Sequence, residues 1–382
     1  MSELRTEQKE SGAREVASTG AVNGPGAHSL AEILSQPRCW QACREELRKS
    51  GKLAQARERF GKSEAWLFVG CGSSYYVALS AAATMTAVTG RVAHAIPASE
   101  LLLYPDATLA AARGARPVLI SRSGRTSEVL RAAELLAARK IQTIAITCAE
   151  GQPLERMASV AVVLSSADEK STVMTRSFSS MLLALQELAG MVEENKAFCA
   201  AIEKMPASAA KILETLPGRI DQFAREHRTG PSKFADYVCL GQGPYYGLAC
   251  EYALKLTEMS LSYGQVFHTL EFRHGPKSIV GPETLLVFLL SEAGYDAERE
   301  VLEEMKALGA TTLVVANEAD AGVRAAADLL VELQLDVPEL ARLAPTLFAG
   351  QLLGLYTGLH KGLDPDSPKN LSRVVELEGG AN

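Results

Sequence analysis

Short apolar runs alternate with longer amphipathic stretches through most of this chain. Residues 65–69 (AWLFV) form one such run, which ends in the turn Gly70-Cys71-Gly72, and an alanine-rich stretch follows over residues 75–88. The apolar run predicts a buried strand, the glycines predict a turn, and the longer stretch predicts a helix. The pattern therefore predicts a strand–loop–helix unit.

The same alternation continues toward the middle of the chain. Residues 117–120, 142–147 and 161–164 are apolar runs of strand length, and helices are predicted up to about Arg139 and from about Ser177 onward. Strands that alternate with helices in this way predict a parallel sheet covered by helices.

The second half of the chain repeats the first. A shift of 171 residues places the first glycine turn on Gly241-Gln242-Gly243. After the same shift, the apolar runs 285–290 and 312–316 correspond to two predicted strands of the first half. The loop after residue 290, however, is not serine-rich, unlike the loop after residue 120. The sequence therefore predicts an α/β protein with two tandem domains, each a parallel β-sheet flanked by helices in a flavodoxin-like three-layer sandwich.

The domain boundaries follow from this repeat and from local composition. The N-terminal segment is polar and rich in glycine and serine, which predicts disorder. Ser29 and Glu32 have the spacing of a capping box that opens a helix. We place the junction of the domains between about residues 200 and 232. The predicted segments are a disordered tail (1–28), N-terminal helices (29–60), a first domain (61–205) and a second domain (215–382).

Charge and composition exclude several classes of partner. The formal net charge is −6, which gives no electrostatic reason to bind nucleic acid. No apolar stretch approaches the ~20 residues that span a bilayer, and the longest, residues 284–290, fits a buried strand. The seven cysteines include no CxxC pair, which favours free thiols in a reducing cytoplasm. Cys39 and Cys43 fit packing on one helix face.

One loop has the composition of a phosphate site. Residues 121–126 (SRSGRT) follow a predicted strand and open a predicted helix. Hydroxyl groups and the free N–H groups of a helix N-terminus can hydrogen-bond a phosphate, and Gly124 permits close approach of the backbone. The loop is not a P-loop, so no nucleotide is implied. An ordinary Ser/Thr helix cap is the alternative. Ser73 and Ser74 follow the neighbouring strand and would share its rim.

A second motif places charged groups on one helix face. Glu251, Lys255 and Glu258 are spaced i, i+4 and i+7, so they lie on the same side of the predicted helix. Such a row can hold a carboxylate and an ammonium together for proton transfer. The alternative is a solvated ladder of opposite charges.

A third motif offers a histidine for proton transfer. His274 precedes Gly-Pro and is therefore predicted to lie on a loop, where it can exchange protons near neutral pH. The alternative is a metal site, since the count of His268, Glu271 and His274 would allow one, but no fourth ligand stands nearby. We therefore predict no metal and no other cofactor.

These motifs together resemble the double-SIS sugar isomerases, which include the isomerase half of glucosamine-6-phosphate synthase. The chain is especially similar to the family of tagatose-6-phosphate ketose/aldose isomerases and galactosamine-6-phosphate deaminases. The resemblance covers nearly everything after residue 28 and rests on SRSGRTSE, STVMTRSFSSM, EYALKLTE and FRHGPKS. It implies two tandem SIS domains.

The resemblance also implies roles for individual residues. Those implied to bind the sugar phosphate group are Ser74, Ser121, Arg122, Ser123 and Thr126. Those implied to contact the sugar are Ser73, Val173 and Thr175. The implied catalytic residues are Glu258, the base that moves a proton between C1 and C2, with Lys255 and Glu251 beside it, and His274, which opens the sugar ring. The related synthase takes this histidine from the neighbouring subunit, which implies a homodimer here.

The implied activity is isomerisation of an amino-sugar 6-phosphate with release of ammonia. The residue after Met1 is Ser2 and not a nucleophilic cysteine, so glutamine is not expected as the nitrogen donor. Arg373 stands where the synthase has a tail lysine, and arginine cannot form an imine. Three alternatives stay open: an isomerase of neutral hexose 6-phosphates, a fructosamine-6-phosphate deglycase, and a sugar-phosphate sensor without turnover. Both the gluco and the galacto configuration are possible substrates.

Overall fold

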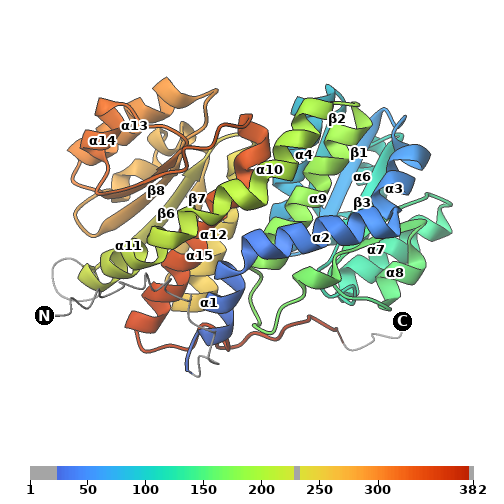
Figure 1. Ribbon diagram of the computed structural model, residues 1–382, viewed down its shortest axis with the longest axis horizontal. Coiled ribbons are helices and arrows are strands. Elements are labelled where there is room, and N and C mark those ends of the chain that lie inside the picture. Colours follow the sequence, from blue (N-terminus) through green and yellow to red (C-terminus); the bar gives the residue numbers. More distant parts are fainter. Residues whose placement is uncertain (1–23, 228–232, 378–382) are drawn as a thin grey trace, which may run out of the picture.

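Two α/β domains lie side by side in the computed structural model, which describes residues 24–227 and 233–377 (Figure 1). Each domain is built on a parallel five-stranded sheet flanked by helices, so the predicted fold class is confirmed. None of the helices in these two stretches is long and apolar enough to cross a membrane.

The first sheet has the strand order β2-β1-β3-β4-β5 with all neighbours parallel. Its strands are β1 (Ala65–Gly70), β2 (Val92–Pro97), β3 (Ala115–Ile120), β4 (Ile144–Thr147) and β5 (Val160–Val163). The helices around it are α4 (Ser73–Thr89), α5 (Ala98–Leu103), α6 (Pro105–Ala111), α7 (Ser127–Ala138), α8 (Pro153–Met157), α9 (Arg176–Val192) and α10 (Lys196–Ala210). A short 3-10 turn, η1 (Ser165–Ala167), precedes α9.

The second sheet has the order β10-β9-β8-β6-β7, which is the same arrangement read from the opposite edge. Its strands are β6 (Asp236–Gly241), β7 (Gly264–Phe267), β8 (Thr284–Leu289), β9 (Thr311–Ala316) and β10 (Leu329–Glu332). The helices are α11 (Ile212–Glu226), α12 (Pro244–Ser260), α13 (Tyr295–Ala307), α14 (Ala321–Ala326) and α15 (Leu343–His360), with 3-10 turns η3 (Glu271–Arg273), η4 (Pro276–Ile279) and η5 (Glu339–Arg342).

The repeated glycine turn has the same geometry in both domains. A Cβ on Gly70 would lie 2.5 Å from the backbone of Ser74, and a Cβ on Gly241 would lie 2.6 Å from the carbonyl oxygen of Tyr245. The second glycine of each turn is left-handed, with φ of 54° at Gly72 and 53° at Gly243. Glycine is needed at both places because one position leaves no room for a side chain and the other favours a positive φ. This explains why the motif recurs after 171 residues.

The first helix begins earlier than its sequence predicts. Helix α1 (Ala27–Leu34) has Gly26 as its N-cap, so Ser29 lies inside the helix and the proposed capping box is wrong. The carboxylate of Asp366 caps the helix instead, since it accepts hydrogen bonds from the backbone N–H groups of His28 (2.8 Å) and Ser29 (2.7 Å). Glu32 accepts from the backbone of Lys170 at 2.5 Å.

The remaining N-terminal segment and the predicted boundaries also gain detail. After α1, the predicted N-terminal helices (29–60) form two further helices, α2 (Gln36–Ser50) and α3 (Lys52–Phe60), which are separated by Gly51. Of the predicted tail 1–28, residues 1–23 lie outside the described residues, while residues 27 and 28 are helical. Helices α10 and α11 meet at Lys211, which lies between the predicted end of the first domain (205) and the predicted start of the second (215).

The segment after α15 leaves the second domain and runs back along the first (red in Figure 1). Backbone hydrogen bonds join Thr172 to Asp366 (3.3 Å) and Ser127 to Val375 (3.2 Å). The C-terminal part of the predicted second domain therefore lies against the first domain. We call residues 364–377 the C-terminal tail.

Candidate active site

A row of three charged side chains on α12 is the centre of the candidate site. The Nζ atom of Lys255 lies 3.2 Å from Oε1 of Glu251 and 2.5 Å from Oε2 of Glu258. The hydroxyl group of Ser73, on the first turn of α4, donates to Oε1 of Glu251 at 3.1 Å. One domain thus supplies the row and the other supplies a hydrogen bond to it, which excludes the solvated ladder of charges.

Burial divides the row into hidden and reachable groups. The side chain of Lys255 is 0% exposed, that of Glu251 is 1% exposed and that of Glu258 is 18% exposed. Oε2 of Glu251 has no hydrogen-bond partner among the described residues. Glu258 is therefore the carboxylate of the row that is accessible from outside, and Lys255 and Glu251 lie behind it.

The buried members of the row have perturbed pKa values. Burial raises the pKa of Glu251 to about 7, although the Lys255 ammonium opposes this shift and the Glu258 charge adds to it. Burial lowers the pKa of Lys255, but the two neighbouring carboxylates outweigh burial and leave that pKa raised. Lys255 is therefore a cation at neutral pH, next to a carboxyl group that changes its protonation there.

Helix α12 is held in place by close contacts with helices on two sides. A Cβ on Gly247 would lie 2.5 Å from the hydroxyl oxygen of Ser80 in α4. On α15, a Cβ on Gly354 would lie 2.8 Å from the carbonyl oxygen of Lys255. These glycines let the helix backbones approach so closely that the charged row has a fixed position.

The predicted phosphate loop forms at the carboxyl ends of neighbouring parallel strands, β1 and β3. The hydroxyl groups of Ser121 and Thr126 lie 3.0 Å apart, and the N–H of Gly124 donates to Oγ of Ser121 at 3.2 Å. Oγ of Ser123 accepts from the N–H of Arg125 at 3.2 Å. Ser74 is buried on the first turn of α4. The loop thus gathers hydroxyl groups at the N-terminus of α7, where an anion is favoured.

Arg122, expected to bind the phosphate, makes its guanidinium contacts with other residues than these hydroxyl groups. Its side chain is 7% exposed and lies 3.5 Å from a carboxylate oxygen of Glu169. It donates to the carbonyl oxygens of Thr172 at 2.9 Å and Arg373 at 2.7 Å. Arg122 therefore joins the phosphate loop to the segment before α9 and to the C-terminal tail.

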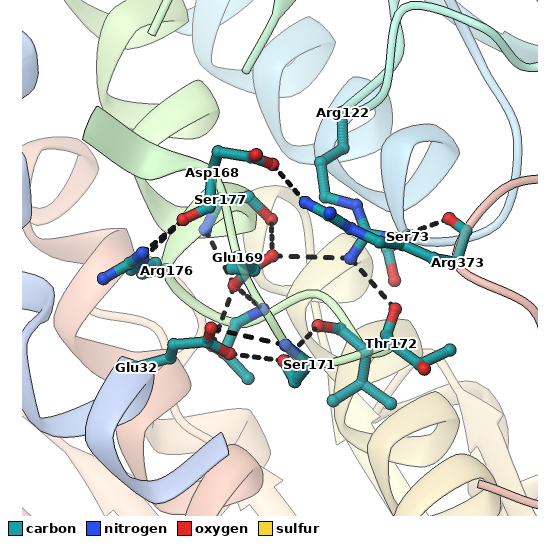
Figure 2. Close-up of polar contacts among 12 residues, drawn as sticks. Glu32, Ser73, Arg122, Asp168, Glu169, Ser171, Thr172, Arg176, Ser177 and Arg373 are labelled. Atoms are coloured by element: carbon teal, nitrogen blue, oxygen red, sulfur yellow. Dashed lines mark hydrogen bonds and ion pairs between the residues drawn. The ribbon is translucent and has the colours of Figure 1, made fainter. Parts of the chain in front are cut away.

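Glu169 is the acceptor at the centre of this network, which Figure 2 shows. Its Oε1 accepts from the backbone N–H of Thr175 at 2.6 Å and from the hydroxyl of Thr175 at 2.8 Å. Its Oε2 accepts from the hydroxyl of Ser177. Thr175 is fully buried and Val173 is 2% exposed. The Thr175 hydroxyl, expected to contact the sugar, is therefore occupied by a structural contact.

Glu169 was not among the predicted site residues, although the sequence contains a signal for it. The residues Asp168 and Glu169 stand just before a helix start rich in serine and threonine. A carboxylate near such a start commonly satisfies the free N–H groups of the helix and interacts favourably with its dipole. Here the carboxylate of Glu169 also accepts from the backbone of Ser177, at 3.2 Å.

The C-terminal tail crosses the phosphate loop. The side chain of Arg373 pairs with Asp168. Further along, the Arg125 guanidinium lies 2.6 Å from a carboxylate oxygen of Glu376. The tail thus contacts both ends of the loop, and Arg373 is paired with a carboxylate at the place of the synthase lysine.

No hydrogen bond between described residues joins His274 to the row on α12. It is exposed after η3, in a loop that Arg273 and Lys277 fasten to Glu304 on α13, each at 2.7 Å. His268, the other histidine of this region, stacks on Tyr246 with ring centres 3.9 Å apart. Across residues 24–227 and 233–377, no three His, Cys, Asp or Glu side chains gather as a metal site.

The loop after β8 in the second domain corresponds to the phosphate loop, and a carboxylate holds it in place. Oε2 of Glu298 accepts from the backbone N–H of Ser291 at 2.7 Å, and Oε1 accepts from the Ser291 hydroxyl at 3.0 Å. An open cavity of about 750 Å³ lies at this sheet edge. Four carboxylates and two guanidinium groups line it, and this negative balance disfavours a phosphate: Glu292, Glu318, Glu332 and Asp336 against Arg324 and Arg342.

Comparison with known proteins gives this arrangement a context. Residues 60–191 match the SIS domain. The fold resembles the solved structure of a glucosamine-6-phosphate deaminase from Thermotoga maritima, with a TM-score of 0.71 and 29% identity over 92% of this chain and 100% of that chain. It also resembles the tagatose-6-phosphate ketose/aldose isomerase from Escherichia coli, with a TM-score of 0.77 and 24% identity over 95% of this chain and 99% of that chain.

The relatives that match this chain in sequence are longer proteins. A glutamine–fructose-6-phosphate aminotransferase (isomerizing) from Methanothermobacter thermautotrophicus is 28% identical over 355 residues, which cover 91% of this chain and 57% of that protein. The corresponding protein from Escherichia coli K12 is 25% identical over 334 residues, or 85% of this chain and 53% of that protein. This chain thus spans about half the length of these relatives.

Proposed function

We propose that this SIS-domain chain is an enzyme that converts a hexosamine 6-phosphate and water into a ketohexose 6-phosphate and ammonia. The observation that carries the proposal is the row Glu251–Lys255–Glu258, which is joined through Ser73 to the domain that carries the phosphate loop. A base, a cation and a phosphate site on neighbouring elements are what an aldose–ketose isomerisation requires. The deaminase and isomerases among its structural neighbours support the same reaction class.

The proposed chemistry begins once the sugar ring is open. The Glu258 carboxylate takes the proton from C2, and the resulting negative charge develops on O1. The buried Lys255 ammonium stabilises this charge from behind Glu258, through its electrostatic field rather than by direct contact. Glu258 then returns the proton to C1 while a proton passes from the nitrogen to O1, which leaves a hydroxyl group at C1 and an imine at C2. Water adds to this imine and the C–N bond breaks, so ammonia leaves and the C2 carbonyl of the ketose forms. His274 is proposed to move the proton between O5 and O1 during ring opening.

Two further parts of the proposal concern assembly. The second sheet repeats the strand order of the SIS-matching first domain, and its glycine turn has the same geometry, so we propose a second SIS domain there. His274 is exposed and lies on a loop fastened to α13 rather than on the α12 row. We therefore propose that a second copy of the chain brings its own His274 to this site, as a homodimer.

The first experiment measures ammonia release from galactosamine 6-phosphate and from glucosamine 6-phosphate, tested separately. The variant Glu258→Gln keeps the shape of the side chain but removes the base, so we expect release to fall by at least about 10³-fold while sugar-phosphate binding is retained. Glu214→Gln is the matched control, because Glu214 is an exposed residue of α11.

The outcomes separate the possible activities. Release from one sugar alone assigns both the deaminase reaction and the sugar configuration. Turnover by Glu258→Gln close to that of the unchanged chain would remove Glu258 as the base. Interconversion of neutral hexose 6-phosphates without ammonia release would favour a plain isomerase over the deaminase.

A further inference from the structure

The phosphate loop contains two arginines, and only Arg125 is exposed at the surface of the loop. Arg122 is buried and its guanidinium is bound to Glu169 and to two backbone carbonyl groups. The side chain of Arg125 is 51% exposed. A phosphate monoester carries close to two negative charges near neutral pH, which neutral hydroxyl groups do not balance. A guanidinium group binds phosphate with two parallel hydrogen bonds.

Arg125 already has an anionic partner from the C-terminal tail. Its Nη2 atom lies 2.6 Å from Oε1 of Glu376, whose side chain is 50% exposed. On either side of Glu376, the Val375 carbonyl accepts from the N–H of Ser127 at 3.2 Å, and the N–H of Leu377 donates to the Ser127 hydroxyl at 2.9 Å. Ser127 is the first residue of α7, so the tail occupies a backbone N–H group at the helix end that attracts anions.

We propose that Arg125 is the cation that recognises the substrate phosphate, and that Glu376 is a built-in competitor that holds Arg125 until a phosphate displaces it. The proposal rests on the proposed function, because it takes the loop at residues 121–126 as the phosphate site. The exchange favours phosphate, since an ion pair with both side chains half exposed is weak and a phosphate monoester brings close to two negative charges where Glu376 brings one.

The exchange would free only the outer part of the tail. Further back, the Arg373 carbonyl is held by the buried guanidinium of Arg122 at 2.7 Å, and the Arg373 side chain pairs with Asp168. These contacts do not involve Arg125. The tail therefore stays attached at Arg373 while residues 375–377 leave the loop and make room for the ligand.

The test compares Arg125→Gln, Glu376→Gln and the double variant in the full-length chain. Calorimetry measures the Kd for inorganic phosphate, and steady-state kinetics measure KM and kcat for the hexosamine 6-phosphate. We expect Arg125→Gln to raise both Kd and KM by about 10-fold or more, with kcat little changed, because a hydrogen bond to a charged group is lost. We expect Glu376→Gln to lower both by about 2- to 5-fold, the range of an exposed ion pair.

The double variant and two controls complete the test. Because Glu376 acts through Arg125, the double variant should match Arg125→Gln. Arg131→Gln and Glu134→Gln make the same charge changes on exposed positions of α7 and should leave Kd and KM unchanged. An unchanged Kd in Arg125→Gln, or a raised Kd in Glu376→Gln, would overturn the proposal. The phosphate Kd is measured without turnover, so it decides this point even where no ammonia release is found.

Discussion

Three buried carboxylates in this molecule are compensated in three different ways. Glu251 faces the ammonium of Lys255, and Glu169 accepts hydrogen bonds from a helix start. Among the described residues, Glu298 has only the donors of Ser291, and burial raises its pKa to about 7. Burial thus raises the pKa of Glu251 and of Glu298 to a similar value, although one faces an ammonium and the other faces the donors of a serine.

The raised pKa values determine how stability depends on pH. The ordinary value is 4.5, and both Glu251 and Glu298 have a pKa of about 7 in the folded chain. The folded chain therefore binds these protons more tightly than the unfolded chain does. The resulting stabilisation is fully present below about pH 4.5 and is lost as the pH rises to about 7.

Glu298→Gln tests this dependence away from the proposed site. Glutamine is neutral at every pH, so the variant avoids the buried charge that the unchanged chain carries at pH 8. We expect its free energy of unfolding, relative to the unchanged chain, to rise by about 1–3 kcal/mol between pH 5 and pH 8. Urea unfolding at the two pH values measures this, with Glu214→Gln as an exposed control. A relative stability that does not change with pH would contradict the assigned pKa shift.

Residue spacing predicted the row on α12 but not the direction of Arg122. Helical periodicity decides which residues share a face, so Glu251, Lys255 and Glu258 could be grouped from the sequence. The guanidinium of Arg122 ends a long flexible side chain, and its direction is set by Glu169, which lies 47 residues further along. No local pattern contains that information.

At the scale of elements, α12 depends on small residues of its neighbours. Gly350, Gly354 and Gly358 of α15 all face it, and a Cβ on Gly358 would lie 2.1 Å from the carbonyl oxygen of Met259. Side chains normally keep the axes of packed helices about 8–10 Å apart. This series of glycines therefore allows an unusually close approach of the two backbones. The position of Lys255 is therefore set by a helix that contributes no side chain to the row.

Gly354→Ala tests that dependence. The new methyl group would meet the Lys255 carbonyl at 2.8 Å, so one helix backbone must shift. We expect a loss of about 1–3 kcal/mol in the free energy of unfolding, together with a lower kcat because the α12 row moves. Gly218→Ala is the control: nothing lies within 4 Å of its Cβ, and alanine should stabilise α11 by about 0.5–1 kcal/mol. Equal stability of the two variants would contradict the close packing of α15 on α12.

The central strands could be predicted from the sequence, whereas several edge strands could not. Strands β1, β3, β6 and β8 each contain at least four consecutive buried apolar residues, so an apolar run marks each of them. The edge strands β2 and β7 have no fully buried residue. Their pairing is decided by the neighbouring strand and not by an apolar pattern of their own.

At the scale of the whole molecule, the two ends of the described chain are tied to each other. Asp364 and Asp366 cap α1 from 338 residues away, with the N–H of Gly26 donating to Asp364 at 2.9 Å. Asp366 also binds the Ser29 hydroxyl at 2.6 Å. One short acidic segment therefore fixes both the start of the first helix and the path of the C-terminal tail.

Asp366→Ala removes this junction. The N–H groups of His28 and Ser29 would lose their acceptor, and we expect the free energy of unfolding to fall by about 1–2 kcal/mol, as for other lost helix caps. Asp366→Asn retains one oxygen acceptor and should lose less. Urea unfolding of both variants measures the difference. Alanine and asparagine variants as stable as the unchanged chain would exclude a stabilising role for the cap.

The return of the C-terminal tail to the first domain restricts how the gene for this protein can be rearranged. The matched SIS segment ends at residue 191, yet Arg122 and Arg125 in that segment are bound by residues 373 and 376. A recombination that transferred the first domain alone would leave its phosphate loop without these contacts. A partner protein fused directly after residue 377 would instead begin beside that loop, so gene transfer and protein engineering both have to treat the two halves as one unit.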